Sequence, residues 1–307
     1  VSHEIWSCRL VAPRPSEEQA RLLQKASQSQ IKEVVYRVQQ SVILLIPDAA
    51  LLYHLKGNLQ QAMIGLPRLR SFMELIEGPC TGNDSRFLRL FWETSYLQDW
   101  REFPKGGGYA KWYGNRFYTI RRGETGEYLK GHPGSIIPNE QFYFLPGLQY
   151  TEAANGSLGV RLHFCEAIPG NKAPFIAVSQ RYQFTYMGVL NCRAISYFAR
   201  TLATAIDFGI GPLRSIPLPE LPSDAAERIG KAAHVATTLK QIIKSQDLLD
   251  IGSFSITSGS TIPPELLEVL LISTESFIES LVFNAYKFTQ EDVEIVLADV
   301  GIPPGFH

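Results

Sequence analysis

The run Gly159-Val-Arg-Leu-His-Phe (159–164) alternates apolar and polar side chains at every second position. A period of two predicts a β-strand with one face in a core. Three further runs have a similar character: Arg116-Phe-Tyr-Thr-Ile-Arg, Gln141-Phe-Tyr-Phe-Leu and Phe175-Ile-Ala-Val-Ser. Turn-forming stretches separate the runs, namely Gly106-Gly-Gly, Gly131-His-Pro-Gly and Pro169-Gly-Asn. We therefore expect a β-rich α+β module over residues 72–222.

Helical segments are expected on both sides of this module. Residues 1–71 hold an apolar stripe over 16–40, a short strand at 41–46 and a second helical stretch at 48–63. Residues 182–205, inside the module, are expected to be helical as well. The connector at 216–222, Ile-Pro-Leu-Pro-Glu-Leu-Pro, is predicted to be extended, because each proline disfavours helix in the residue before it.

Residues 223–307 are predicted to form a C-terminal helical segment. Apolar residues recur at helical spacing over 224–249, which predicts one long helix. Residues 264–300 predict two helices that are split near Lys287, with Thr289 as the N-cap of the second. The expected fold class is thus α+β, a β-rich module flanked by N-terminal and C-terminal helical segments.

Charge is distributed unevenly along the chain. The 307 residues carry a net charge of -1, yet residues 101–130 hold seven basic and three acidic side chains. Residues 265–299 hold eight acidic side chains against one lysine. This distribution is compatible with a polyanion that binds the basic segment at 101–130 and not the acidic segment at 265–299.

The composition also excludes several classes of protein. No run of eighteen apolar residues is present, so we expect no membrane span. The start of the chain lacks the order of a secretory signal, and Val1 in place of Met suggests a fragment. The four cysteines form no C-x-x-C pair, which argues against a zinc site or a disulfide scaffold and favours reduced thiols in a cytoplasmic protein.

No catalytic motif is found in the chain. The sequence has no G-x-x-x-x-G-K-[ST] phosphate loop, no G-x-G-x-x-G, no H-E-x-x-H and no G-x-S-x-G. The six histidines lie far apart, and His163 in its alternating run is more typical of a strand residue than of a base. We therefore predict no catalytic residue and no metal site in this chain.

Two stretches have residue types that suit a nucleic acid. In the first, residues 77–93, a Gly/Asn-rich turn precedes Arg86 and Arg89, which share one face if the segment is helical. Backbone N–H groups and two guanidinium groups suit a phosphate, although an ordinary turn with surface arginines explains the same residues. In the second, residues 105–122, flexible glycines alternate with aromatic and basic residues. This composition favours nucleic-acid contact, and a twisted hairpin with a solvated basic face is the alternative.

Several blocks of the sequence resemble one family. Thr81-Gly-Asn-Asp-Ser-Arg-Phe-Leu-Arg-Leu-Phe-Trp-Glu resembles the T-G-D-N-x-R-F-x-R-x-W-x-E block of the large adenine-specific DNA methyltransferases of phage defence. These are the PglX-type enzymes of BREX, with relatives in DISARM and among type IIG restriction–modification enzymes. Further blocks occur in the family's order: Lys111-Trp-Tyr-Gly-Asn, Gln141-Phe-Tyr-Phe-Leu-Pro-Gly-Leu-Gln-Tyr-Thr, Tyr186-Met-Gly-Val-Leu-Asn-Cys-Arg, Ile216-Pro-Leu-Pro-Glu-Leu and Gly301-Ile-Pro-Pro-Gly-Phe-His. Gly82-Asn-Asp inverts the usual G-D-N, and Cys192 stands where Ser is common.

The resemblance implies a target-recognition region without its catalytic half. In this family the N-terminal half binds S-adenosylmethionine and carries an (N/D)-P-P-(Y/F) motif, which this chain lacks. The chain alone is then non-catalytic and holds no cofactor, whereas the full-length parent is expected to be an adenine-N6 methyltransferase that uses S-adenosylmethionine. The expected partners are double-stranded DNA, the upstream methyltransferase domain and other phage-defence proteins.

The DNA-contacting residues are expected in residues 81–130 and the strands that follow. Phosphate contacts are assigned to Arg86, Arg89, Lys105, Arg121, Arg122 and Lys130. Base-edge contacts are assigned to residues among Lys111, Tyr113, Asn115, Arg116, Arg161, Ser179 and Arg181. Thr81, Gly82, Asn83 and Trp112 complete the predicted interface through the family blocks. The helix over 224–249 is interpreted as a spacer, and the acidic helices as facing away from DNA.

Two alternatives remain at this level. In the first alternative, the chain is a protein-interaction platform of a defence complex, and the acidic helices form the docking surface. In the second it is a separate specificity subunit of a type I system, which ranks lower because such subunits carry two similar halves and no internal repeat is found here.

Overall fold

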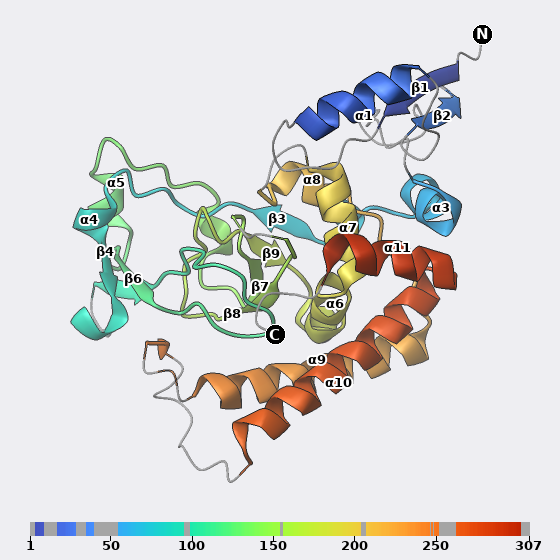
Figure 1. The fold of residues 1–307 in the computed structure, drawn as a ribbon. Helices are drawn as coiled ribbons and strands as arrows, with labels where there is room; N and C mark the ends of the chain where they lie inside the picture. Colours follow the sequence, from blue (N-terminus) through green and yellow to red (C-terminus); the bar gives the residue numbers. More distant parts are fainter. Residues whose placement is uncertain are drawn as a thin grey trace. The chain divides into compact units, whose positions relative to one another are not determined.

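The computed structural model describes residues 4–8, 17–28, 35–39, 55–94, 99–153, 156–203, 207–245, 247, 249–251 and 262–301. The chain divides into two compact units, Val1–Leu66 and Pro67–His307 (Figure 1). The described parts are α+β in class, as the sequence predicts, with small antiparallel sheets and long helices towards the C-terminus.

The first unit contains a strand pair that the sequence analysis did not predict. Strand β1 (Glu4–Cys8) pairs antiparallel with β2 (Val35–Gln39), and helix α1 (Glu17–Ser27) lies between them in sequence. The helix expected over 16–40 is therefore wrong at residues 35–39. The β-branched and aromatic residues of β2 favour a strand once a pairing partner is available, and the partner lies far away in sequence.

The rest of the first unit is only partly described. Helix α3 (Gly57–Gly65) covers the end of the helical stretch expected at 48–63. Residues 55 and 56 are not helical, and residues 48–54 lie outside the described part of the chain. The strand expected at 41–46 falls outside the described residues.

A four-stranded antiparallel sheet forms the centre of the second unit. Its order is β3 (Glu74–Ile76), β9 (Phe175–Ala177), β7 (Gly147–Tyr150) and β8 (Val160–His163). Glycine is required at position 147, because an added Cβ would lie 2.3 Å from the Phe175 ring. The strands β8 and β9 lie within the runs 159–164 and 175–179, so the alternating pattern predicted both correctly.

The run at 141–145 is not a strand. Its first residues lie in a 3₁₀ turn, η4 (Glu140–Phe142), and Phe144 has a φ of 62°. A positive φ interrupts extended backbone, so the strand starts only at Gly147. Composition alone did not separate this aromatic turn from the strand next to it.

A second, three-stranded antiparallel sheet carries the first candidate stretch. Its order is β4 (Leu88–Leu90), β6 (Tyr118–Arg121) and β5 (Trp100–Glu102), with the short helices α4 (Asp84–Phe87) and α5 (Glu127–Lys130) beside it in Figure 1. The sheet has a core of its own, formed by Phe87, Leu88, Phe103, Ile120, Leu129, Tyr143 and Ile168. It therefore presents its exposed side chains on a packed scaffold.

Helices form the remainder of the second unit. Two of them, α6 (Gln183–Leu190) and α7 (Arg193–Leu202), lie in the helical stretch expected at 182–205, with a break at Asn191 and Cys192 and an end at Leu202. The short helix α8 (Ile210–Arg214) precedes the proline connector, which is extended as predicted: the Leu218 N–H donates to the Pro67 carbonyl.

The C-terminal helices lie where the sequence predicts them, except that α9 (Ser223–Lys244) ends before the predicted end at 249. The long helices α9 and α10 (Pro264–Ala285) run side by side, and α11 (Gln290–Val300) follows (Figure 1). Thr289 caps α11 as predicted, since its hydroxyl accepts from the Asp292 N–H. None of the described helices combines the length and apolarity that a membrane crossing needs.

Candidate nucleic-acid interface

The turn at residues 81–83 is a rigid helix start. Thr81 is buried, and its hydroxyl donates to the Asp84 carboxylate. The Asn83 side chain accepts from the Arg86 N–H at 3.1 Å, which caps α4. Gly82 has a φ of 67°, and an added Cβ would lie 2.3 Å from the Gly134 carbonyl oxygen. These residues, predicted to touch DNA, fix the backbone before the arginines.

Arg86 and Arg89 project from that turn with exposed guanidinium groups. Arg86 lies 5.3 Å from the Phe87 ring centroid. Arg89 donates to the carbonyl oxygens of Ser85 and Leu88, both at 2.7 Å. Within the part of the chain that the structure describes, neither arginine is ion-paired with a carboxylate. Both retain donors for an external anion.

The other predicted phosphate contacts differ in how available they are. Lys105 is half-buried and ion-paired with Asp84. Arg121 and Lys130 are exposed, with carboxylate partners at 3.6 Å and 3.0 Å. Arg122 is buried and donates to the Glu124 carbonyl oxygen, so its side chain acts within the fold. The exposed ion pairs of Arg121 and Lys130 are weak, so each of these side chains can exchange its carboxylate partner for a phosphate.

The Lys-Trp-Tyr block is an anchor rather than an exposed surface. Trp112 is 1% exposed. Its backbone N–H donates to the Val160 carbonyl at 2.8 Å, and this bond joins the loop to β8. Its indole N–H donates to Glu275 of α10. Lys111 lies 3.5 Å from the same carboxylate. Burial by itself would lower the pKa of Lys111, but Glu275 outweighs this effect and raises it above its ordinary value.

Arg116 is held by an internal carboxylate. Its guanidinium donates to both oxygens of Glu102, at 2.7 and 2.6 Å, and lies 4.0 Å from the Phe164 ring centroid. A third bond goes to the hydroxyl of Tyr113, which is also buried. Desolvation opposes the charge, but the Glu102 carboxylate leaves the pKa of Arg116 raised. Both residues were predicted to read bases, and the fold uses them internally.

Arg161 is the most deeply buried of the predicted base-reading residues. It is 0% exposed and donates to the Thr151 hydroxyl at 3.0 Å. Burial lowers the pKa of Arg161 to about 10. The remaining candidates are more accessible: Asn115 is half-buried and donates to the Gly108 carbonyl at 3.0 Å, whereas Ser179 and Arg181 are exposed.

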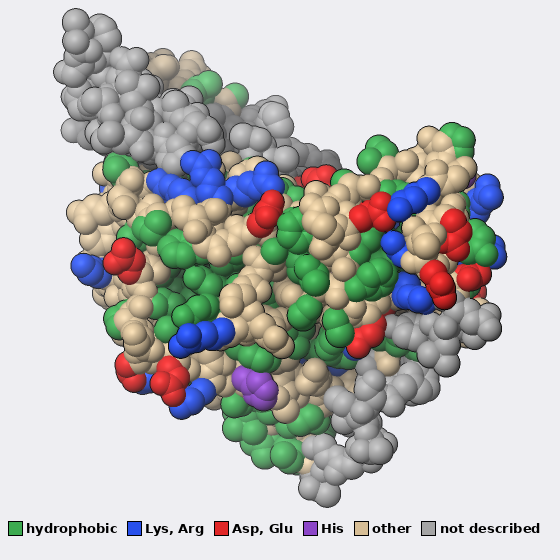
Figure 2. Space-filling model, turned by 180° about the vertical axis from the view of Figure 1, so that it is seen from behind, with side chains coloured by type: hydrophobic (Ala, Val, Ile, Leu, Met, Phe, Trp, Pro, Cys, Tyr) green, Lys and Arg blue, Asp and Glu red, His purple; other side chains and the backbone are tan. Residues whose placement is uncertain are grey.

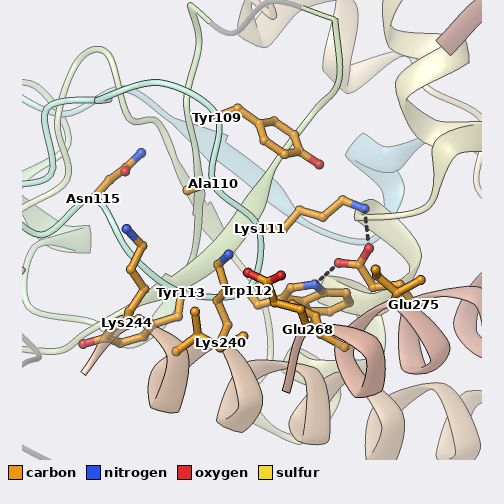
Figure 3. Close-up of a pocket in the computed structure, with 13 residues that line it drawn as sticks. Tyr109, Ala110, Lys111, Trp112, Tyr113, Asn115, Lys240, Lys244, Glu268 and Glu275 are labelled. Atoms are coloured by element: carbon orange, nitrogen blue, oxygen red, sulfur yellow. Dashed lines mark hydrogen bonds and ion pairs between the residues drawn. The ribbon is translucent and has the colours of Figure 1, made fainter. Parts of the chain in front are cut away.

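A pocket of about 320 Å³ lies where this loop meets the long helices (Figure 3). It is lined by Tyr109, Ala110, Lys111, Trp112, Tyr113, Asn115, Lys240, Ile243, Lys244, Glu268, Leu271, Ile272 and Glu275. The lining residues from α9 and α10 are not among those predicted from the sequence. A signal was present in the spacing of Lys240 and Lys244, which puts two cations on one face of a predicted spacer.

Charge on the molecular surface is mixed. In the view of Figure 2, basic side chains gather along one edge of the described surface, and elsewhere single cations lie among acidic and hydrophobic side chains. Of the residues that the structure describes, no group of three or more His, Cys, Asp or Glu side chains is arranged to hold a metal ion.

Comparisons with known proteins support a relationship to methyltransferases of restriction and modification. Over 207 residues the chain is 25% identical to the adenine-specific methyltransferase PglX of Lacticaseibacillus casei (strain Zhang). In fold it is similar to the type IIL restriction–modification enzyme MmeI, solved in complex with DNA, with a TM-score of 0.50 and 12% identity.

These matches cover only part of each protein. The PglX match takes in 60% of this chain and 17% of that protein. The MmeI match takes in 75% of this chain and 35% of the MmeI chain. No protein-family model matches the sequence.

Proposed function

We propose that this chain is a sequence-specific recognition module for double-stranded DNA. In this proposal it positions one adenine for N6 methylation by an S-adenosylmethionine-dependent domain outside residues 1–307, in a phage-defence or restriction–modification system. The observation that carries the proposal is the pair Arg86 and Arg89, exposed and without carboxylate partners among the described residues. The similarity to the adenine-specific methyltransferase PglX is the reason for proposing DNA as the ligand of this pair.

The proposed contacts divide into two groups. Arg86, Arg89, Arg121 and Lys130 approach the phosphate backbone from the three-stranded sheet and its flanking helices, and they set the register on the duplex. Base edges are read by side chains that remain accessible, namely Asn115, Ser179 and Arg181. Lys111, Trp112, Tyr113, Arg116 and Arg161 support this surface from inside.

Replacing both Arg86 and Arg89 by glutamine is expected to weaken duplex binding equally for all sequences. Each lost phosphate contact removes about 0.9 from the slope of log affinity against log salt concentration, so the double variant should lose about two. Fluorescence anisotropy of a labelled duplex across a salt series measures this slope. The order of preference among duplexes selected from a randomised pool should stay the same.

Arg200→Gln is the matched control, because Arg200 is an exposed arginine on α7 that is bonded to the Asp299 carbonyl. Its salt slope should equal that of the unmodified chain. An unchanged slope in the double variant would remove these arginines from the interface. Binding that is absent, or independent of salt, in the unmodified chain would contradict the proposed function itself.

A protein-interaction platform is the second candidate function, and one observation favours it. Helix α10 exposes Leu266, Val269, Leu270, Ile272 and Phe277, each 40–56% accessible. Exposed apolar patches on a protein surface commonly mark interaction sites. The surface is apolar, so the docking feature is this row rather than the acidic residues of α11.

The variant Leu266→Ser/Val269→Ser is expected to lose co-purification of partner proteins in this second case. Duplex binding through Arg86 and Arg89 should be unaffected, because both replaced side chains belong to α10, whereas these arginines belong to α4 and β4. Parallel purification from the native host, quantified against the unmodified chain, measures the loss. Glu291→Lys/Glu294→Lys tests the acidic helix, whereas Asp292 is unsuitable because it is buried in the cap of α11. Retention of every partner by both variants would argue against the platform.

A further inference from the structure

Two lysines of α9 face the pocket beside the Lys-Trp-Tyr loop. Lys240 and Lys244 are four residues apart, so they lie on the same side of the helix. In Figure 3 both side chains rise from α9 towards the loop, with Asn115 on the opposite side and the α10 carboxylates to one side. The cavity of about 320 Å³ is at the small end of the range for ligand sites, about 300–1,000 Å³.

The charges around this pocket are not all paired. Lys111 lies 3.5 Å from Glu275, and Lys244 lies 2.9 Å from Asp247. The ammonium group of Lys240 forms no hydrogen bond with any described residue, and no described carboxylate oxygen lies within 4.0 Å of its nitrogen. The Glu268 and Glu275 carboxylates that also line the pocket act on this ammonium group at longer range.

The environment of Lys240 disfavours its positive charge. Desolvation lowers the pKa of Lys240, and the neighbouring charge of Lys244 adds to this effect. Glu275 and Glu268 act in the opposite direction without restoring the ordinary pKa. A partly buried cation in this condition gains from an anion that enters its pocket.

We propose that this pocket binds a phosphate group between Lys240 and the loop at residues 109–115, with Lys244 as the second cation. An ammonium offers three donors to phosphate oxygens, and Lys244 can exchange its half-buried carboxylate partner Asp247 for the ligand. If the phosphate belongs to DNA, which rests on the proposed function, α9 touches the nucleic-acid backbone and is more than the spacer that the sequence predicts.

Lys240→Met tests the DNA source of this phosphate. Methionine keeps the apolar stem of the side chain and removes the charge. The slope of log affinity against log salt for duplex binding should fall by about one, with the preference among sequences unchanged. Lys231→Met is the matched control, since Lys231 is exposed on the same helix and paired with Glu227. Its slope should not change.

A second arm uses inorganic phosphate at constant ionic strength, with chloride as the reference. Phosphate should raise the thermal unfolding midpoint of the unmodified chain and of Lys231→Met, but not of Lys240→Met. A phosphate effect that depends on Lys240 without a change in salt slope assigns the site to free phosphate. The same effect in a chain that binds no duplex contradicts the proposed function and leaves the phosphate site standing. If Lys240→Met changes neither measurement, the site is overturned.

Discussion

Arg116→Met is expected to destabilise the chain by about 3–5 kcal/mol, the usual effect of leaving one charge of a buried pair without its partner. The Glu102 carboxylate is 2% exposed and accepts two hydrogen bonds from this guanidinium. Without the guanidinium, the carboxylate must stay charged in a dry environment or take up a proton. Urea denaturation, followed by circular dichroism, gives the free energy of unfolding.

The double variant Glu102→Met/Arg116→Met separates this pair from general damage to the core. Removing both charges of a buried pair is commonly far less harmful than removing one. The double variant should therefore be more stable than Arg116→Met. The opposite result, an Arg116→Met chain of normal stability that has lost its sequence preference, would mean that Arg116 reads a base and that the sequence interpretation was right.

Local sequence was sufficient for elements whose pattern is self-contained. The alternation at 159–164 predicts β8, and the threonine before two acidic residues predicts the start of α11. Local sequence was insufficient where a pairing partner far away in the chain decides the structure. Residues 35–39 form a strand because β1 is available to pair with them, and no pattern within 16–40 indicates that partner.

The sequence could not indicate which of the predicted contact residues are engaged inside the fold, for a related reason. Basic and aromatic residues between 105 and 122 favour a nucleic acid as long as their carboxylate partners are unknown. The fold brings Glu275 to Lys111 and Trp112 from a distant helix, and it brings Glu102 at the end of β5 to Arg116, which precedes β6. Arg86 and Arg89 stayed exposed because the capped turn that precedes them is rigid and buries Phe87 in their place.

Glu275→Ala is expected to destabilise the chain by about 3 kcal/mol or more, because it leaves the buried ammonium of Lys111 unpaired. Lys111 is 7% exposed, and the indole N–H of Trp112 loses its acceptor in the same change. Since Glu275 belongs to α10, the loss should loosen the loop at residues 109–115 from the helices. Urea denaturation measures the global effect, and hydrogen exchange of the Trp112 amide measures the local one.

Glu275→Gln divides this effect into its two causes. The glutamine carbonyl can still accept from the Trp112 indole, so any loss of stability in this variant reports the charge of Lys111. The raised pKa of Lys111 adds stability that is fully present below its ordinary value of 10.5 and is lost as the pH rises through the folded-state pKa. That alkaline loss should disappear in Glu275→Gln. If Glu275→Ala stays within about 0.5 kcal/mol of the unmodified chain, as a surface substitution would, the loop is not anchored through this carboxylate.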